Sequence, residues 1–173
     1  MIIKLFKENG ITVVNVVRRE EQVEMLKKEY DADYVLNSTN ENFDKELYEL
    51  STKLGCNVGL ECVAGDMPGR ILQVLSRNGV LISYGQLSEQ PIGPINPIVL
   101  IFKAQKIEPF LLPYWIASKS YWAQWSALSA SKKLIQTTKV NKCFGLHQIH
   151  EAIEYYKANM TEGKVFLKPS LTE

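Results

Sequence analysis

ITVVNVV, residues 11–17, is a run of mostly β-branched side chains between Gly10 and a charged segment. A short, nearly continuous apolar run of this kind is typical of a strand buried on both faces of a sheet. Residues 20–30 follow it with apolar side chains on one face, and Glu24 is spaced to pair with Lys28 one turn later. The sequence therefore predicts a strand followed directly by a helix.

The alternation of helix and strand extends on both sides of this unit. Residues 1–10 have the pattern of the last turns of an amphipathic helix. Downstream we expect strands at residues 34–36, 57–62 and 80–84, and helices at residues 43–54 and 67–77. Strict alternation with short connections is the pattern of right-handed βαβ crossovers. It predicts an α/β fold with a Rossmann-like, doubly wound parallel sheet; the alternative is another open α/β sheet, for example a flavodoxin-like one.

Beyond residue 84 the composition changes to a loop rich in Gly, Pro and Asn. We expect a short helix at 98–104, a strand at 106–112, a long helix at 115–136, an extended segment at 137–144, a helix at 147–159 and a strand at 163–167. Pro109 lies inside the predicted strand 106–112. Because proline has no N–H to donate, this strand is expected at an edge of the sheet.

One expected feature of a dinucleotide-binding fold is not found. No G-x-G-x-x-G motif occurs in the chain, and no strand with a Gly-rich turn precedes the predicted helix at residues 1–10. We therefore expect a sheet lacking its first strand and Gly-rich loop, so that residues 1–173 form a single partial dinucleotide-binding domain. Since that first strand would sit centrally in the sheet, we expect poor solubility or a need for a partner.

Composition limits the classes of partner. The formal net charge of the 173 residues is +1, with 20 Lys and Arg against 19 Asp and Glu, which gives no electrostatic footprint for nucleic acid or an acidic membrane. The longest apolar run, residues 98–102, is far too short for a membrane span. The three cysteines form no CxxC pair, and we interpret them as buried thiols in a reducing compartment.

Several side chains that could carry chemistry have a simpler explanation. His147 and His150 are three residues apart but have no further ligands at metal-binding spacing, so no metal site is predicted. Cys62 at a strand end could be a nucleophile, although a packed thiol is favoured because no activating group accompanies it. The aromatic side chains at 114–125 could form a ligand platform, but a core or subunit interface is favoured. No residue is predicted to be catalytic.

The tip of the strand at residues 11–17 carries Arg18 and Arg19. In dinucleotide-binding folds an acidic side chain there holds the ribose hydroxyls of NAD, whereas arginine accommodates the 2′-phosphate of NADP. A planar guanidinium fork matches a phosphate in shape and charge. The two residues therefore favour NADP, and the alternative is a solvated pair at the start of a helix.

Five short segments in a fixed order carry a resemblance to a known family. They are Asn15-Val16-Val17-Arg18, Cys62-Val63-Ala64-Gly65, Gly79-Val80-Leu81-Ile82-Ser83-Tyr84-Gly85, Leu100-Ile101-Phe102-Lys103 and Gly163-Lys164-Val165. Together they resemble the cofactor-binding, C-terminal part of the medium-chain dehydrogenase/reductase superfamily. The strand tip at residues 15–18, the Tyr84-Gly85 turn and the segment at residues 100–103, followed by Phe110 and Trp115, are most similar to mitochondrial 2-enoyl thioester reductases.

The resemblance implies a set of cofactor-binding residues. Arg18 matches an arginine for the adenosine 2′-phosphate, with Arg19 beside it. The remaining matches are Tyr84, Gly85, Gln86 and Leu87 in a cofactor-lining turn, Phe110, Leu111 and Leu112 beside the nicotinamide, and Lys164 at the far end of the site. The implied cofactor is NADP. The family's catalytic tyrosine lies in a separate N-terminal domain, for which we find no counterpart here.

The resemblance implies that the chain is the cofactor-binding portion of an NADPH-dependent oxidoreductase. The implied enzyme reduces the C=C bond of 2-enoyl thioesters, as in mitochondrial fatty acid synthesis. The implied compartment is the mitochondrial matrix. The implied partner is a second copy, or a larger complex, bound through the edge strand at residues 106–112. Two alternatives stay open: a non-catalytic relative that serves as an accessory subunit, and a quinone oxidoreductase-like enzyme.

Overall fold

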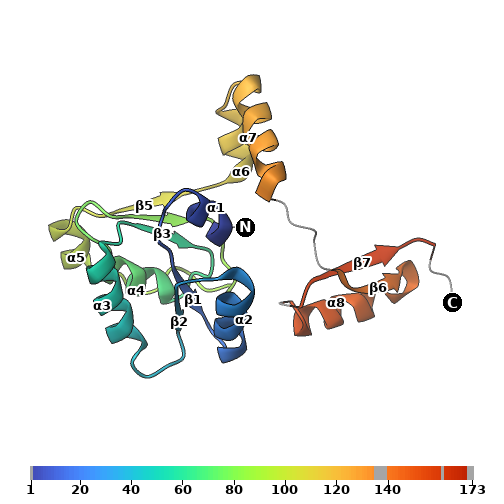
Figure 1. Cartoon of the computed structure of the whole chain (residues 1–173), viewed down its shortest axis with the longest axis horizontal. Helices are drawn as coiled ribbons and strands as arrows, with labels where there is room; N and C mark the ends of the chain where they lie inside the picture. The colour runs from blue at the N-terminus through green and yellow to red at the C-terminus, as the bar shows by residue number, and fades with distance from the viewer. Residues whose placement is uncertain (1, 135–139, 161, 171–173) are drawn as a thin grey trace. The chain divides into compact units, whose positions relative to one another are not determined.

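The structure is a computed structural model that describes residues 2–134, 140–160 and 162–170. The chain divides into two compact units, residues 2–125 and residues 126–173. Figure 1 shows α-helices alternating with strands along the first unit. No helix among the described residues is long and apolar enough to cross a bilayer.

The first unit repeats strand and helix in the predicted order. Its elements are α1 (Ile2–Glu8), β1 (Val14–Val17), α2 (Glu20–Tyr30), β2 (Tyr34–Asn37), α3 (Phe43–Leu54), β3 (Val58–Glu61), α4 (Met67–Val74), β4 (Val80–Ser83), α5 (Pro97–Phe102), β5 (Lys106–Pro109) and α6 (Leu112–Ala117). The predicted bounds of α2 and α3 are confirmed to the residue, and the other elements differ by a few residues at their ends. Gly55 ends α3 because it takes up the left-handed conformation, φ 64°, which glycine adopts without steric cost.

All strand pairs in this unit are parallel. β1 pairs with β2, and β3, β4 and β5 form a second sheet in that order. A parallel pair needs a crossover connection, which α2 provides between β1 and β2, α4 between β3 and β4, and α5 between β4 and β5. The prediction of a Rossmann-like α/β fold with parallel strands is therefore confirmed.

The core of the unit lies between the helices and the strands. Phe43 at the start of α3 is fully buried, and the guanidinium of Arg70 from α4 lies 4.4 Å from the centroid of its ring. Leu72 and Leu75 pack against Leu81 of β4 in a buried apolar cluster. Burying a side chain of this size stabilises the fold by about 1.5–3 kcal/mol relative to exposure. In Figure 1, α3 and α4 lie side by side, as this packing requires.

The edge position predicted for β5 is confirmed. The backbone N–H of Lys106 donates to Gly79 O (3.0 Å), and the N–H of Phe110 donates to Ser83 O (2.8 Å). Because hydrogen-bond direction alternates along a strand, the nitrogen of Pro109 faces away from β4, where no N–H is needed. Within the described residues β5 pairs only with β4.

The prediction of one long helix at residues 115–136 is wrong. The described part contains two helices, α6 and α7 (Tyr121–Leu134), with a break between them. Ser118 Oγ donates to Trp115 O (2.8 Å), and Ser120 Oγ accepts from Ala123 N at the start of α7. Serine side chains that satisfy backbone groups in this way end one helix and cap the next. Residues 135 and 136 lie outside the described residues.

The second unit contains a parallel strand pair and a helix. β6 (Val140–Gly145) pairs with β7 (Lys164–Lys168), and between them lie a 3₁₀ turn, η1 (Leu146–Gln148), and α8 (Ile149–Ala158). Phe144 is buried and packs in a tilted arrangement on Tyr155, with ring centroids 5.6 Å apart. The predicted helix and strand at 147–159 and 163–167 are thus confirmed, with the first turn of the helix being 3₁₀.

Candidate functional site

The strand tip of β1 presents the two arginines. Arg18 follows Val17 directly and is exposed, and Arg19 is the N-cap residue of α2. The backbone N–H groups of both donate to Gln22 Oε1 at 3.2 Å, which fixes the start of the helix. Ser38 N–H donates to Val17 O (2.7 Å), so the β1–β2 pairing continues to this end. Arg18 therefore lies at the carboxyl end of parallel strands, where open α/β sheets bind ligands.

The turn after β4 crosses closely over the end of β3. The backbone N–H of Tyr84 donates to Glu61 O, and that of Leu87 donates to Cys62 O, both at 2.9 Å. A Cβ atom at Gly85 would lie 2.9 Å from Cys62 O and 3.0 Å from Cys62 Cβ, so a side chain would force the turn away from β3. Gln86 Nε2 donates to the Gln90 carbonyl at 2.9 Å. Glycine is therefore required at this position because the turn packs directly against the end of β3.

Tyr84 is held as a neutral phenol. Burial, together with a hydrogen bond to Cys62, raises the pKa of Tyr84 from 10.0 to about 12. The raised pKa keeps the phenol protonated to higher pH than an ordinary tyrosine. Cys62 itself is half-buried against this ring, which agrees with a packed thiol.

A buried carboxylate below this turn was missed by sequence reasoning. Glu61 is only 2% exposed, and its Oε1 atom accepts hydrogen bonds from the N–H groups of Val63 (2.5 Å) and Ala64 (2.8 Å). Its Oε2 atom is buried with no hydrogen-bond partner in the structure. Buried carboxylates are rare unless they are paired. The available signal was an acidic residue at the end of an apolar strand.

The remaining predicted residues follow β5 or belong to the second unit. Phe110, Leu111 and Leu112 come directly after Pro109, and all three side chains are exposed. Lys164 is the first residue of β7, with its ammonium 5.8 Å from the centroid of the Tyr156 ring. Lys164 belongs to the second unit, whereas the other nine predicted residues belong to the first. The role of all ten predicted residues in cofactor binding stays a prediction.

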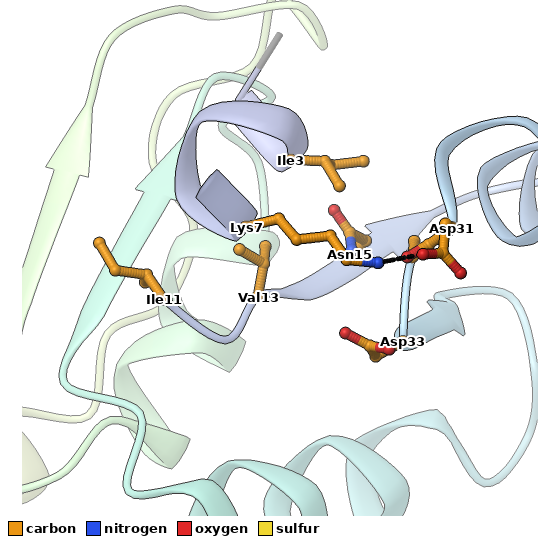
Figure 2. Close-up of a pocket in the computed structure, with 8 residues that line it drawn as sticks. Ile3, Lys7, Ile11, Val13, Asn15, Asp31 and Asp33 are labelled. Carbon is orange, nitrogen blue, oxygen red and sulfur yellow. Dashed lines mark hydrogen bonds and ion pairs between the residues drawn. The ribbon is translucent and has the colours of Figure 1, made fainter. Parts of the chain in front are cut away.

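Two hollows in the first unit differ greatly in size. Arg18, Glu61 and Tyr84 share the lining of a cavity of about 700 Å³. The other hollow, shown in Figure 2, has about 20 Å³ between α1 and the start of β1 and is closed by an ion pair from Lys7 to Asp31. The hydrogen bond to Asp31 raises the pKa of Lys7. A space of that size holds about one water molecule, whereas the larger of these two hollows has room for a ligand.

No zinc-binding cluster is found in the described ranges. Within residues 2–134, 140–160 and 162–170, no three His, Cys, Asp or Glu side chains converge as metal ligands would. His147 lies in η1 and His150 in α8, and both are exposed. These residues do not fit a zinc site, so no step is assigned to a metal.

Comparison with known proteins identifies the family. Residues 1–131 match the family model described as zinc-binding dehydrogenase. Mitochondrial enoyl-[acyl-carrier-protein] reductase from Caenorhabditis elegans is 33% identical over 119 residues, which cover 66% of this chain and 32% of that protein.

Solved structures show the same fold. A protein assigned as an NADPH:quinone reductase from Mesorhizobium loti is 29% identical with a TM-score of 0.82, covering 97% of this chain and 49% of that one. The mitochondrial 2-enoyl thioester reductase Etr1p/Etr2p heterodimer from Candida tropicalis is 21% identical with a TM-score of 0.73, covering 95% of this chain and 49% of that one.

The matches cover only part of each relative. This chain spans between about a third and a half of the length of these proteins. The family match covers three quarters of the chain, from α1 to within α7, and includes every predicted site residue except Lys164. The chain therefore belongs to the zinc-binding dehydrogenase family, in the medium-chain dehydrogenase/reductase superfamily of oxidoreductases.

Proposed function

We propose that this chain forms the cofactor-binding portion of an oxidoreductase that uses NADPH to reduce the C=C bond of 2-enoyl thioesters, in mitochondria. The observation that carries the proposal is the exposed guanidinium of Arg18 at the carboxyl end of parallel strands. The mitochondrial enoyl reductase from Caenorhabditis elegans, which is similar over 66% of this chain, supports the substrate class and the compartment.

Arg18 would bind the adenosine 2′-phosphate. Its guanidinium is always charged and offers a planar fork of donors to the phosphate oxygens. Arg19 adds a second positive charge at the same strand tip. A carboxylate at this position would instead repel the phosphate, and no acidic side chain lies between Val17 and the first turn of α2.

The turns after β4 and β5 would hold the rest of the cofactor. Gly85 allows the turn to pack against the end of β3, and this packing would position Tyr84, Gln86 and Leu87 beside the cofactor. The apolar side chains of residues 110–112 would cover the nicotinamide face and exclude water. Lys164 would contribute a positive charge from the second unit. The residues at the carboxyl ends of the strands thus fit the chemistry of a dinucleotide.

The bound cofactor supplies a hydride to one carbon of the substrate double bond. This chain's own residues bind and orient it. We assign no catalytic residue to the described part of the chain, so the proton for the second carbon comes from a donor outside it. The activity of the complete reductase is part of the proposal.

The cofactor assignment is tested by titrating the protein with NADPH and NADH and following its amide signals by NMR. We expect NADPH to shift the signals of residues 18–19 and 84–87. Arg18→Ala should weaken NADPH binding about tenfold or more and leave NADH within about twofold. The matched control is Arg77→Ala, an equally exposed arginine that precedes β4 at the opposite end of the strand. Equal losses for both cofactors would show that Arg18 does not bind the 2′-phosphate.

A quinone is the second candidate substrate. It is favoured by the similarity to the Mesorhizobium loti protein, which covers nearly the whole of this chain. NADPH oxidation should be measured with a trans-2-butenoyl thioester and with a benzoquinone, using protein isolated from its source with whatever is bound to it. Turnover of the quinone alone would contradict the enoyl thioester proposal.

We also propose that the chain pairs with a second copy through β5. The outer edge of β5 carries exposed Ile107, and exposed apolar side chains follow it at residues 110–112. The Candida tropicalis reductase is described as a heterodimer, which supports pairing between related chains.

Ile107→Pro tests the pairing. The alternation that turns Pro109 outward also turns the Ile107 nitrogen outward, so proline there removes a donor from the free edge without breaking a bond to β4. Sedimentation equilibrium should show a weaker dimer for Ile107→Pro, while a dimer of unchanged affinity would contradict pairing through this edge.

A further inference from the structure

Two Asn-Gly pairs occur in the chain, Asn9-Gly10 and Asn78-Gly79. Such a pair is prone to lose the asparagine amide, because glycine has no side chain to keep its backbone nitrogen away from the preceding side-chain carbonyl carbon. The two pairs are chemically identical. They differ in the hydrogen bonds and the packing that the fold gives to the glycine.

Asn9-Gly10 follows the last turn of α1, and both residues are exposed. Gly10 adopts a left-handed conformation, φ 67°, and its N–H donates to Lys7 O at 3.0 Å. The N–H of Ile11 donates to Phe6 O at 2.8 Å. These two bonds form a Schellman motif, a common end of a helix. Nothing lies within 4 Å of a Cβ atom placed on Gly10, so the space beside it is open.

Asn78-Gly79 lies in the tight turn between α4 and β4 and is held on several sides. The N–H of Asn78 donates to Lys103 O (2.7 Å), at the end of α5, and Gly79 O accepts from Lys106 N–H (3.0 Å), at the start of β5. The N–H of Gly79 donates to Ser76 O (3.1 Å). Gly79 is buried, and a Cβ atom there would lie 2.9 Å from Ser76 O. Opening this turn therefore disturbs α5 and β5 as well.

The cost of freeing the glycine nitrogen separates the two pairs. Attack on the side chain requires this nitrogen to leave its hydrogen bond and approach the asparagine carbon. Ends of short helices open at little cost, whereas segments bonded into the sheet open only with their neighbours. Because α1 has seven residues and Gly10 is exposed, the nitrogen of Gly10 is freed more often than that of Gly79.

We propose that Asn9 is a site of spontaneous deamidation in the folded protein and that the fold protects Asn78. The nitrogen of Gly10, once it has lost its proton, forms a bond to Cγ of Asn9. The bond from Cγ to Nδ2 breaks, and the amide nitrogen leaves as ammonia. Water then opens the cyclic imide at one of its two carbonyls and leaves aspartate or isoaspartate. No electrons are gained or lost.

The reaction changes the end of α1. Asn9 Nδ2 donates to Leu5 O at 2.7 Å, a bond that a carboxylate cannot make. The new negative charge also lies at the carboxyl end of the helix, where the helix dipole disfavours it. Isoaspartate adds a backbone atom and so misplaces the N–H groups of Gly10 and Ile11. We therefore expect the last turn of α1 to loosen. None of these residues belongs to the predicted cofactor site, so the proposal holds whichever cofactor and substrate the protein uses.

The test compares the two pairs within one sample. The whole protein is incubated at neutral pH and digested briefly under acidic conditions. Mass spectrometry then follows the peptides that contain Asn9 and Asn78, and an isoaspartate methyltransferase assay measures the isoaspartate product. We expect Asn9 to react at least about tenfold faster than Asn78 in the folded protein. In urea, where neither turn is formed, the two rates should converge.

A pair of glycine variants identifies the nucleophile. Gly10→Asn keeps a residue that tolerates the left-handed conformation, but its side chain crowds the attacking nitrogen. It should slow the reaction at Asn9 about tenfold or more. The matched control is Gly55→Asn, because Gly55 ends α3 with φ 64° and also has nothing within 4 Å of an added Cβ atom. This control should leave the rate at Asn9 unchanged. Hydrogen exchange at residues 8–11 should quicken as the product accumulates.

Three results would overturn the proposal. Equal rates at Asn9 and Asn78 in the folded protein, or a faster reaction at Asn78, would show that the fold does not select Asn9. An intact Asn9 after a period in which the urea-unfolded protein reacts would show that α1 protects it. An unchanged rate in Gly10→Asn would show that the Gly10 nitrogen is not the attacking group.

Discussion

The carboxylate of Glu61 accepts a hydrogen bond from the backbone N–H of Ala64 at 2.8 Å, and Ala64 adopts a left-handed conformation with φ 62°. The buried side chain thus holds a tight turn directly after β3. Its hydrogen bonds to two successive N–H groups replace the ladder bonds that end with the strand. A non-glycine residue with positive φ costs free energy, and this bonding offsets the cost.

Glu61→Leu should lower the free energy of unfolding by about 1–3 kcal/mol, because two backbone donors lose their acceptor. Glu61→Gln keeps one side-chain oxygen and should cost less. Urea unfolding followed by circular dichroism measures both. The same change at exposed Glu46, in α3, should stay within about 0.5 kcal/mol. A loss at Glu46→Leu as large as at Glu61→Leu would show that the bonds to residues 63 and 64 are not the cause.

Gly69→Ala should destabilise the protein through a backbone clash. A Cβ atom there would lie 2.1 Å from Pro94 O, which cannot move without shifting the loop before α5. Overpacking of this kind costs about 1–3 kcal/mol or more. The control is Gly10, where φ is +67° and nothing lies within 4 Å of the added atom. Asparagine tolerates this conformation, so Gly10→Asn should be nearly neutral in thermal melts while Gly69→Asn should not.

Gln105→Leu should lower the free energy of unfolding by about 1–3 kcal/mol. The buried amide donates to the carbonyls of Leu72 (2.8 Å) and Leu75 (2.9 Å), at the end of α4, where helix carbonyls lack intrahelical partners. Gln73→Leu makes the same change at an exposed position of α4 and serves as the control. Urea midpoints that shift equally for the two variants would contradict this role of Gln105.

Tyr84 should titrate later than an ordinary tyrosine. Burial and the hydrogen bond with Cys62 raise its pKa from 10.0 to about 12, so between these values the unfolded state loses a proton that the native state keeps. The contribution of Tyr84 to stability is therefore fully present below pH 10 and declines as the pH rises to about 12. Absorbance near 295 nm should show one tyrosine that ionises at a higher pH than the others. Tyr84→Phe should remove this step, and Tyr48→Phe, at an exposed position, should leave it unchanged. If Tyr84→Phe instead removes a tyrosine that ionises near pH 10, the pKa of Tyr84 is not raised.

Much of the fold follows from local pattern. The alternation of β-branched runs with amphipathic stretches predicts the helices and strands of residues 11–84 because period 2 and period 3.6 are properties of the chain itself. Pro109 likewise predicts an edge strand, because proline lacks a backbone N–H in any fold. The break at Ser118 and Ser120 was missed because aromatic and apolar side chains continue on both sides of it. Which backbone groups those hydroxyls satisfy depends on the fold around them.

The candidate site likewise has features that the sequence predicts and others that are seen only in the folded structure. The sequence by itself determined the parallel α/β fold and the positive charge at the tip of β1, because apolar periodicity and an arginine following a buried strand can be recognised without coordinates. The burial of Glu61, with one carboxylate oxygen unpaired, is seen in the folded structure and not in the sequence. Its burial depends on contacts such as the pairing of β3 with β4, and no local pattern records whether segments separated in the chain meet.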